Sequence, residues 1–148
     1  MADHCRYKYV LHVEGYSYSG RLKYLQTCHS VVIAHELAWY QHYFPLMQDS
    51  GPQQNYVKVK RDWSDLEEKI KWLQAHPEEA DKIAARGRET MRKYQSQPAN
   101  NCYWREMIRV WGDFQGWKPS LYEDGKQTWR GVPWESFALM KKVDWVPS

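Results

Sequence analysis

The stretch that decides the fold is residues 8–22, which read KYVLHVEGYSYSGRL. Its first part, KYVLHV, is rich in residues that favour β-strands and alternates in part, and this pattern ends at Glu14. A loop of Gly, Ser and Tyr residues follows. Leu22 and Leu25 then stand three apart, as they would on one face of a helix. This region predicts a buried strand, a loop of small residues and a helix.

Two more strands are predicted further along the chain. Residues 30–34, SVVIA, form a short apolar run, and residues 56–60, YVKVK, alternate. Between them, residues 37–44 carry aromatic side chains at helical spacing and predict a helix that Pro45 ends. Residues 48–55 predict a loop. Strands that alternate with helices favour an α/β fold with a Rossmann-like parallel sheet, whose ligands bind beyond the carboxyl ends of the strands.

Three helices are predicted after the third strand. Ser64 and Glu67 have the spacing of a capping box, which predicts a helix that ends near Ala75. Pro77 suits the first turn of the next helix, and Gly87 within it predicts a close packing contact. The apolar stripe of this second helix comprises Ala80, Ile83, Ala84, Met91 and Tyr94. The stripe of the third comprises Tyr103, Met107, Val110, Trp111 and Phe114.

The C-terminal region is rich in Trp and is interrupted by Pro and Gly residues, apart from a short amphipathic stretch at residues 134–142. We therefore expect a domain over residues 1–116 and a tail over residues 117–148 that packs on it.

Composition excludes several classes of protein. The 148 residues fit one compact domain, and a formal charge of +3 without a basic cluster argues against a nucleic-acid partner. No apolar run is long enough for a membrane-spanning helix, and the start MADHCRYKYV lacks the apolar core of a signal peptide. The chain as written is therefore expected to be soluble, which leaves a cytoplasmic location open.

The loop after the first strand is the best candidate for a binding site. A turn of small residues that enters a helix offers backbone amides to a phosphate, and an arginine in the first helical turn can clamp that phosphate in bidentate fashion. The predicted diphosphate cradle consists of Gly15, Ser17, Ser19, Gly20 and Arg21. The loop matches neither GxGxxG nor a Walker A motif, so its pattern alone also allows a turn that binds nothing.

Longer segments of the chain carry a more specific signal. Residues 8–46, residues 56–89 and the segment CYWREM at residues 102–107 follow one another in the order found in a known family. They resemble fungal capsule-associated (CAP-type) glycosyltransferases and Rumi-type protein O-glucosyltransferases, which form glycosyltransferase family 90. The resemblance extends from Cys5 to about Phe114. It implies a GT-B fold of two Rossmann-like halves, of which this chain is the C-terminal, donor-binding half.

The resemblance also implies roles for particular residues. Ser19 and Arg21 match residues that face the diphosphate of a UDP-sugar donor, and Gly15–Gly20 supplies a loop that the donor approaches closely. A fixed guanidinium and helix-end amides stabilise the charge on the leaving UDP, so we expect no metal and no cofactor. The chain has no DxD motif, and its His residues are scattered. Glu36 follows the second strand and is a candidate for contact with ribose or sugar.

The implied reaction transfers sugar, with inversion, from a donor of the UDP-glucose or UDP-xylose class to a hydroxyl of a protein or glycan. The general base of the family lies in the acceptor half, N-terminal to this region, so we expect no catalytic residue here. The first hypothesis is therefore a donor-binding portion of a glycosyltransferase. The alternative is a non-catalytic interaction or carbohydrate-binding protein derived from that domain.

Other side chains receive structural roles. Trp39 is expected to pack in the core rather than stack on sugar, and Asp62 and Asp65 are expected to cap helices. Cys5 and Cys28 both fall at the lower edge of the predicted sheet, so a disulfide is feasible if the chain is lumenal. The resemblance implies such a bridge in secreted relatives of the ER and Golgi lumen. It also implies a partner for the third cysteine, Cys102, in the N-terminal half.

Overall fold

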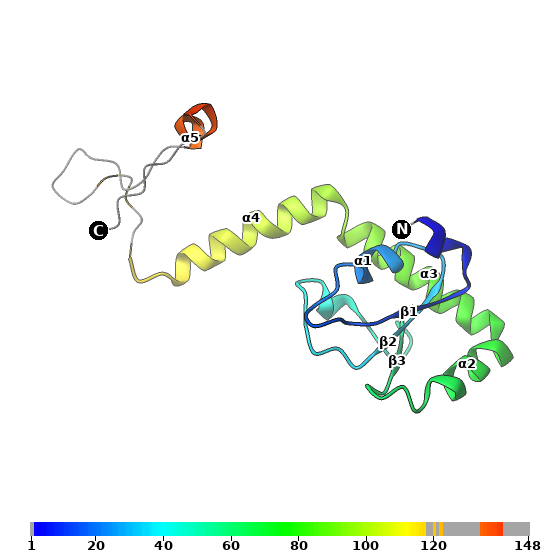
Figure 1. Ribbon diagram of the computed structural model, residues 1–148. Helices are drawn as coiled ribbons and strands as arrows, with labels where there is room; N and C mark the ends of the chain where they lie inside the picture. The colour runs from blue at the N-terminus through cyan, green and yellow to red at the C-terminus, as the bar shows by residue number, and fades with distance from the viewer. Residues whose placement is uncertain (1, 118–119, 121, 123–133, 141–148) are drawn as a thin grey trace. The chain divides into compact units, whose positions relative to one another are not determined.

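A three-stranded parallel sheet forms the core of the N-terminal part of the chain. The structure is a computed structural model that describes residues 2–117, 120, 122 and 134–140. Strands β1 (Tyr9–His12), β2 (Val31–His35) and β3 (Val57–Val59) lie in the order β1-β2-β3, as Figure 1 shows. The register sets Tyr9 opposite Val31, and Ile33 opposite Val57. The three predicted strands and the α/β, Rossmann-like class are confirmed.

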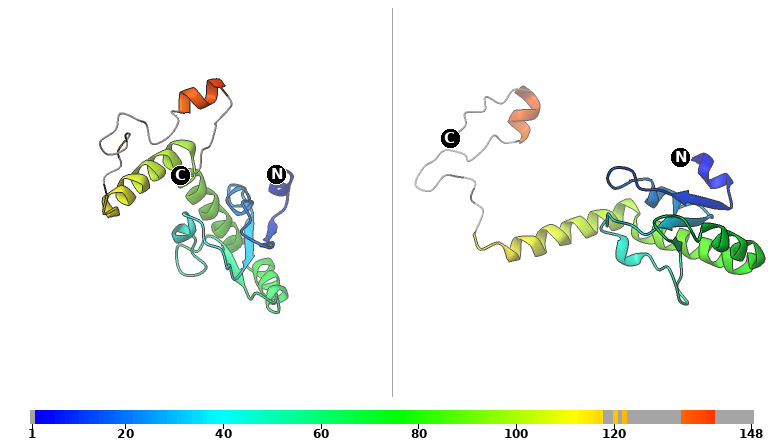
Figure 2. Two further views of the ribbon diagram at one scale, coloured as in Figure 1. Left: turned by 60° about the vertical axis from the view of Figure 1, so that its left-hand side comes forward. Right: turned by 60° about the horizontal axis from the view of Figure 1, so that its bottom comes forward.

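Helices cover both faces of the sheet, because side chains alternate between the faces along each strand. On one face, residues of β1 and β2 pack against α1 (Leu22–Leu25) and against the segment that joins β2 to β3. On the other face, residues of β2 and β3 pack against α2 (Leu66–Ala75) and α3 (Pro77–Tyr94). Figure 2 shows the strands beside these two helices from further directions.

β1 is only half buried, which corrects the prediction of a buried strand. Val10 and His12 are buried, whereas Leu11 is 49% exposed and Val13 is 44% exposed. β1 lies at the edge of the sheet, and the helices on the second face pack mainly against β2 and β3. A strand in this position buries one row of side chains and leaves the other accessible.

α3 follows its prediction closely. It begins at Pro77 and buries Ala80, Ile83, Ala84 and Met91, whereas Tyr94, the last residue of the predicted stripe, is 45% exposed. Gly87 is buried where α3 packs closely against the backbone of Asn55. A Cβ at Gly87 would lie 2.8 Å from the backbone oxygen of Asn55, so the predicted close contact is confirmed.

The predicted helix over residues 37–44 is wrong. This segment is irregular and ends in a short 3-10 helix, η2 (Phe44–Leu46), which contains Pro45 instead of ending before it. Tyr43 is buried, but Trp39 is 51% exposed and Tyr40 is 68% exposed. The expected core packing of Trp39 is therefore wrong as well.

Hydrogen bonds from distant residues hold this segment in its irregular path. The backbone N–H groups of Ala38 and Trp39 donate to the carboxylate of Glu14, each over 3.0 Å. Near the end of the segment, the Asn55 side chain donates to Leu46 O at 2.7 Å. These interactions replace the local i to i−4 hydrogen bonds that a helix would need.

The predicted capping box at Ser64 is also wrong. α2 begins at Leu66 and ends at Ala75 as expected, and its N-cap residue, Asp65, makes no side-chain capping hydrogen bond. Instead, Asp65 accepts a hydrogen bond from Lys60 N at 2.8 Å, and Asp62 accepts one from Ser64 N at 3.1 Å. Both aspartates thus stabilise the turn that precedes the helix, which corrects their predicted role as helix caps.

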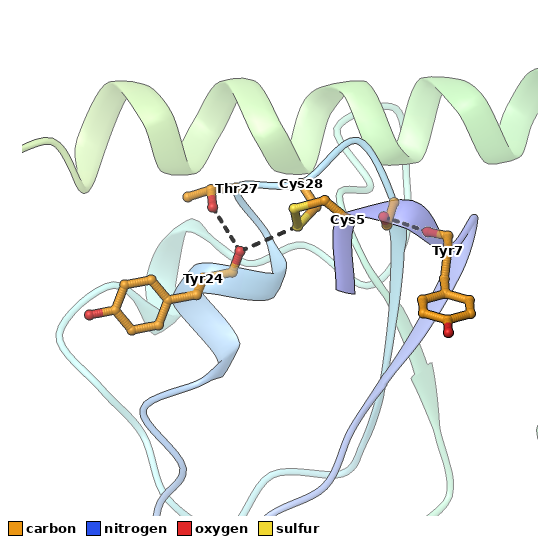
Figure 3. The surroundings of a disulfide bond; sticks show 6 residues. Cys5, Tyr7, Tyr24, Thr27 and Cys28 are labelled. Atoms are coloured by element: carbon orange, nitrogen blue, oxygen red, sulfur yellow. Dashed lines mark hydrogen bonds between the residues drawn. A yellow bond between two sulfur atoms is a disulfide. The ribbon is translucent and has the colours of Figure 1, made fainter. Parts of the chain in front are cut away.

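A disulfide joins Cys5, in the 3-10 helix η1 (Ala2–Arg6), to Cys28 after α1 (Figure 3). Their Cα atoms are 5.0 Å apart, which confirms that the bridge is feasible. Beside it, Ser30 Oγ donates to Tyr7 O at 2.7 Å. The segment before β1 is therefore attached to the start of β2.

The remaining helices of the described residues are α4 (Gln97–Phe114) and α5 (Trp134–Met140). α4 confirms the predicted third helix, although it begins several residues earlier, and none of its residues is buried. The chain divides into two compact units, residues 1–106 and 107–148. Most of residues 117–148 lie outside the described residues, so the predicted tail stays a prediction. Within the part of the chain that the structure describes, no helix has the length and apolarity needed to cross a membrane.

Candidate functional site

The candidate site lies at the carboxyl ends of β1 and β2, where the first loop meets the segment after β2. A small pocket there has a volume of about 10 Å³, enough for about one water molecule. Its polar lining consists of His12, Glu14, Ser19, Gln41 and Tyr43. Gln41 Nε2 donates to Ser19 O at 3.4 Å, which ties the two walls together.

Arg21 is held in a defined orientation at this edge. Its Nε donates to Ser19 Oγ at 3.2 Å, and its Nη2 donates to Val13 O at 3.2 Å. The structure thus brings the predicted residues Ser19 and Arg21 together. A guanidinium has five N–H donors, and these contacts use two of them. The side chain is exposed, so the other three remain available to an anion.

The helix behind Arg21 is weaker than the sequence predicts. α1 has four residues, and Arg21 is itself the N-cap residue, in helical conformation. A single turn sums few peptide dipoles, so helix-end amides add little to the attraction for an anion. The attraction for an anion therefore comes mainly from the guanidinium. This corrects the prediction that helix-end amides contribute to it substantially.

The loop at residues 15–20 is open to solvent. A Cβ at Gly15 or Gly20 would meet nothing within 4 Å, so the protein's own packing does not require glycine there. Ser17 is exposed in the same loop. The small size of these residues leaves room for a ligand to approach the backbone beside Arg21.

Sequence reasoning missed four polar residues of this site, of which Glu14 makes the most contacts; the others are His12, Gln41 and Tyr43. The Glu14 side chain is 3% exposed, and its carboxylate accepts hydrogen bonds from Ala38 N and Trp39 N. Arg61 Nη1, beyond β3, lies 3.6 Å from Glu14 Oε2. Glu14 therefore joins the carboxyl ends of all three strands. The only sequence signal was a carboxylate immediately after a strand.

His35 supports the same junction from the end of β2. Its Nε2 lies 3.0 Å from the backbone N of Glu14, and its Nδ1 lies 2.8 Å from Glu36 O. Since the Glu14 N–H must donate, Nε2 accepts, and Nδ1 carries the proton that Glu36 O accepts. His35 therefore has a structural role at this junction.

Glu36 does not line the pocket beside Arg21. It lines a neighbouring groove of about 260 Å³, which shares Leu37, Phe44 and Met47 with that pocket. The predicted ribose or sugar contact therefore lies next to the pocket beside Arg21 and not within it. The part of the chain that is described contains no group of three or more His, Cys, Asp or Glu residues suited to a metal ion.

His12 forms part of the floor of the pocket. The residue is 2% exposed, and its Nδ1 is buried without a hydrogen-bond partner among the described residues. Burial, with a smaller contribution from the positive charge of Arg21, lowers the pKa of His12 to about 4. His12 is therefore neutral at physiological pH and adds no charge beside Arg21.

The pKa of His12 predicts that the fold loses stability in mild acid. An unfolded histidine titrates near pH 6.5, so from there down to about pH 4 the unfolded chain binds the proton more tightly than the folded one. The free energy of unfolding should fall by about 2 to 3 kcal/mol over this range. Urea titrations from pH 7 to pH 4 should show a shallower fall for His12→Asn. Equal falls in both proteins would contradict the assignment.

Comparison with known proteins assigns a family to this arrangement. The family profile "Glycosyl transferase family 90" matches residues 1–132. The chain belongs to glycosyltransferase family 90. This membership confirms the broader family that the sequence predicted, and the match covers the whole candidate site.

Several curated family members are similar in sequence. The chain is 34% identical over 125 residues to protein O-glucosyltransferase 2 of Danio rerio, which covers 84% of this chain and 24% of the relative. It is 30% identical over 114 residues to protein O-glucosyltransferase 1 of Homo sapiens. This alignment covers 77% of this chain and 28% of the relative. It is 33% identical over 114 residues to the O-glucosyltransferase rumi homolog of Aedes aegypti. This alignment covers 76% of this chain and 28% of the relative. The chain thus spans about a quarter of the length of these relatives.

Proposed function

We propose that residues 13–21 bind the diphosphate of a UDP-sugar, as the donor site of an inverting glycosyltransferase. The observation that supports this most directly is the Arg21 guanidinium. Ser19 and Val13 fix its position at the carboxyl edge of the sheet, and its remaining N–H groups are exposed. Ligands of parallel α/β sheets bind at this edge, and a guanidinium matches the geometry of phosphate oxygens.

The charges around Arg21 are compatible with an anionic ligand. Glu14 is the acidic group of the pocket, and two backbone N–H groups and Arg61 compensate its charge. His12 is neutral. Arg21 therefore keeps its positive charge available for the leaving UDP, whose negative charge grows as the bond to the sugar breaks. This chemistry proceeds without a metal ion or other cofactor.

The groove beside Glu36 is a second part of the proposed donor site. The Glu36 side chain is exposed, and the exposed ring of Tyr40 lines the same groove. We assign to Glu36 a contact with the ribose or the sugar, because a carboxylate accepts hydrogen bonds from hydroxyl groups.

The rest of the reaction is assigned to polypeptide outside this chain. Relatives about four times as long carry O-glucosyltransferase names, which favours transfer of glucose, or of the related xylose, over the capsule-associated branch. The acceptor, a protein or glycan hydroxyl, and the acidic general base would belong to the N-terminal half of a GT-B enzyme. The Cys5–Cys28 disulfide supports an oxidising compartment such as the ER or Golgi lumen.

Calorimetric titration with UDP tests the donor site. We expect saturable binding at moderate salt that weakens roughly 10- to 100-fold in Arg21→Ala, because charge-assisted hydrogen bonds are lost. Arg21→Lys should fall in between, since an ammonium keeps the charge without the planar fork. Arg92→Ala, on the exposed side of α3, is the matched control and should leave the affinity unchanged. A folded chain that does not bind UDP would refute the proposal.

The alternative, a non-catalytic interaction or carbohydrate-binding protein, is favoured by one observation. α4 exposes several large aromatic side chains, of which Trp104 is 48%, Trp111 62% and Phe114 84% exposed. Exposed aromatic surface of this kind is typical of contacts with proteins or sugars. Such a protein would ignore UDP and would be insensitive to Arg21→Ala, so the same titration separates the two functions.

A further inference from the structure

A groove beside β3 is not part of the proposed donor site. It lies between α2 and the loop that joins η2 to β3, where β3 ends the sheet. Its volume is about 310 Å³, which is within the range of sites that bind small molecules. The buried side chains of Val57 and Leu73 supply its apolar part. The groove is therefore a candidate site with a chemistry of its own.

Trp72 gives this groove a fixed aromatic wall. Its ring stacks on that of His76, four residues later, with the ring centroids 4.5 Å apart and the ring planes 21° apart. His76 Nδ1 lies 2.8 Å from Trp72 O, which holds the imidazole in place. The stack covers one face of the indole, and Trp72 is 44% exposed, so the other face is open to a ligand. Because the ring is already held, little entropy is lost when a ligand stacks on it.

Two charged side chains beside Trp72 can bind hydroxyl groups. Glu68 and Lys69 stand four and three residues before Trp72, so the three side chains leave α2 on the same side. Among the described residues, no hydrogen bond or ion pair engages the side chain of Glu68 or Lys69. A carboxylate accepts hydrogen bonds and an ammonium donates them. Together they match a hydroxyl group, which does both.

The charges of the groove cancel. Asp49 and Glu68 are acidic, Lys58 and Lys69 are basic, and Asp49 forms an ion pair with Lys58. A charged ligand would meet as much repulsion as attraction, which favours a neutral one. A pyranose ring is neutral, presents C–H bonds on its faces and carries hydroxyl groups around its rim. Its faces suit the indole of Trp72, and its rim suits the two free charged side chains.

We propose that this groove is a binding site for a neutral glycan, one ring of which stacks on Trp72. The groove borders the one beside Glu36, with which it shares Asp49 and Lys58. It shares no lining residue with the pocket beside Arg21. Glycan binding therefore does not depend on the diphosphate contact of the proposed donor site.

Titration of this chain with cellotriose, followed by two-dimensional NMR, tests the site. The spectrum of Trp72→Phe identifies the indole N–H signal of Trp72 among those of the nine Trp residues. In the natural chain this signal should shift with a dissociation constant on the order of 1 mM, because one stacked ring and a few exposed hydrogen bonds provide little free energy. Sorbitol, which has hydroxyl groups but no ring, should leave it in place. A Trp72 signal that cellotriose does not shift at about 50 mM would overturn the proposal.

Substitutions locate the site, with affinity followed through the signals of the glycan and folding checked by circular dichroism. Trp72→Ala should weaken binding at least about fivefold, whereas Trp72→Phe should retain most of the affinity, because a phenyl ring still stacks. Trp111→Ala removes an exposed indole of α4 and should bind as the natural chain does. Binding that is lost in Trp111→Ala and kept in Trp72→Ala would place the glycan on α4 and refute the proposal.

Arg21→Ala separates this proposal from that of the donor site. The variant should bind cellotriose with unchanged affinity, because Arg21 does not line the groove. Failure of the natural chain to bind UDP would refute the donor site and leave the glycan site standing. Loss of cellotriose binding in a folded Arg21→Ala variant would show that the glycan occupies the donor pocket, and the proposal would then be wrong.

Discussion

Removal of the Cys5–Cys28 disulfide is expected to lower the free energy of unfolding by about 3 kcal/mol. The two cysteines are 23 residues apart, and a cross-link over a loop of this length reduces the entropy of the unfolded chain by roughly this amount. The double variant Cys5→Ala, Cys28→Ala should show the loss in urea unfolding of the oxidised proteins. The N-terminal segment is also held by the hydrogen bond between Ser30 and Tyr7, so the sheet itself should persist.

Cys102 provides the matched control for this measurement. Its thiol is exposed on α4 and is not in a disulfide, so Cys102→Ala should change the unfolding free energy by less than about 0.5 kcal/mol. A reducing agent should destabilise the natural chain and leave the double variant unaffected. Equal stability of the natural chain with and without reductant would show that the bridge does not stabilise the fold.

Gly87→Ala is expected to destabilise the protein by about 1 to 3 kcal/mol, although alanine favours helices. The added methyl group would lie 2.8 Å from the backbone oxygen of Asn55 and 3.3 Å from Oε1 of Gln26. Asn55 cannot move freely, because its own side chain bonds to Leu46 O and to Gln48 N. The overlap should therefore displace α3 from the sheet, which thermal unfolding would register.

Gly112 is a glycine in the same kind of element without the contact. It lies within α4, and a Cβ there would meet nothing within 4 Å. Gly112→Ala should raise helicity, with a gain of up to about 1 kcal/mol from helix propensity. If Gly87→Ala also raised stability, α3 would have to lie further from Asn55 than it does here.

The elements whose stability comes from their own sequence were predictable. α3 is specified locally by Pro77 at its start, by acidic residues in the first turn and by a regular apolar stripe. β2 begins with an unbroken apolar run from Val31 to Ala34, and all of its residues, His35 included, are buried. In these segments, propensity, pattern and tertiary packing favour the same structure, so one sequence is sufficient to identify them.

Residues 37–44 show why the rest was not predictable. Their aromatic residues have helical spacing, yet Glu14, more than 20 residues away, accepts the N–H groups of Ala38 and Trp39. The buried carboxylate must be satisfied, and this requirement outweighs a weak local preference for helix. Ser64 failed as a cap for a local reason, because Asp62, two residues earlier, accepts its backbone N–H and fixes a turn there.

The candidate site divides in the same way. Arg21 was predictable because it follows a Gly- and Ser-rich loop after a strand, which is a local pattern, and its contact with Ser19 spans two residues. Glu14 was not predictable, because its role depends on Ala38 and Trp39, which follow β2, and on Arg61, which follows β3. Long-range partners of this kind leave no periodic trace in the sequence.

The irregular connection between β2 and β3 has a consequence for protein engineering. Leu37, Tyr43 and Met47 anchor this connection in the core, whereas Trp39 and Tyr40 are exposed from it. Helical periodicity does not constrain the exposed positions, so they can be randomised while the anchors stay fixed. The connection thus resembles a hypervariable loop on a constant scaffold, and selection from such a library can change ligand preference without redesign of the sheet.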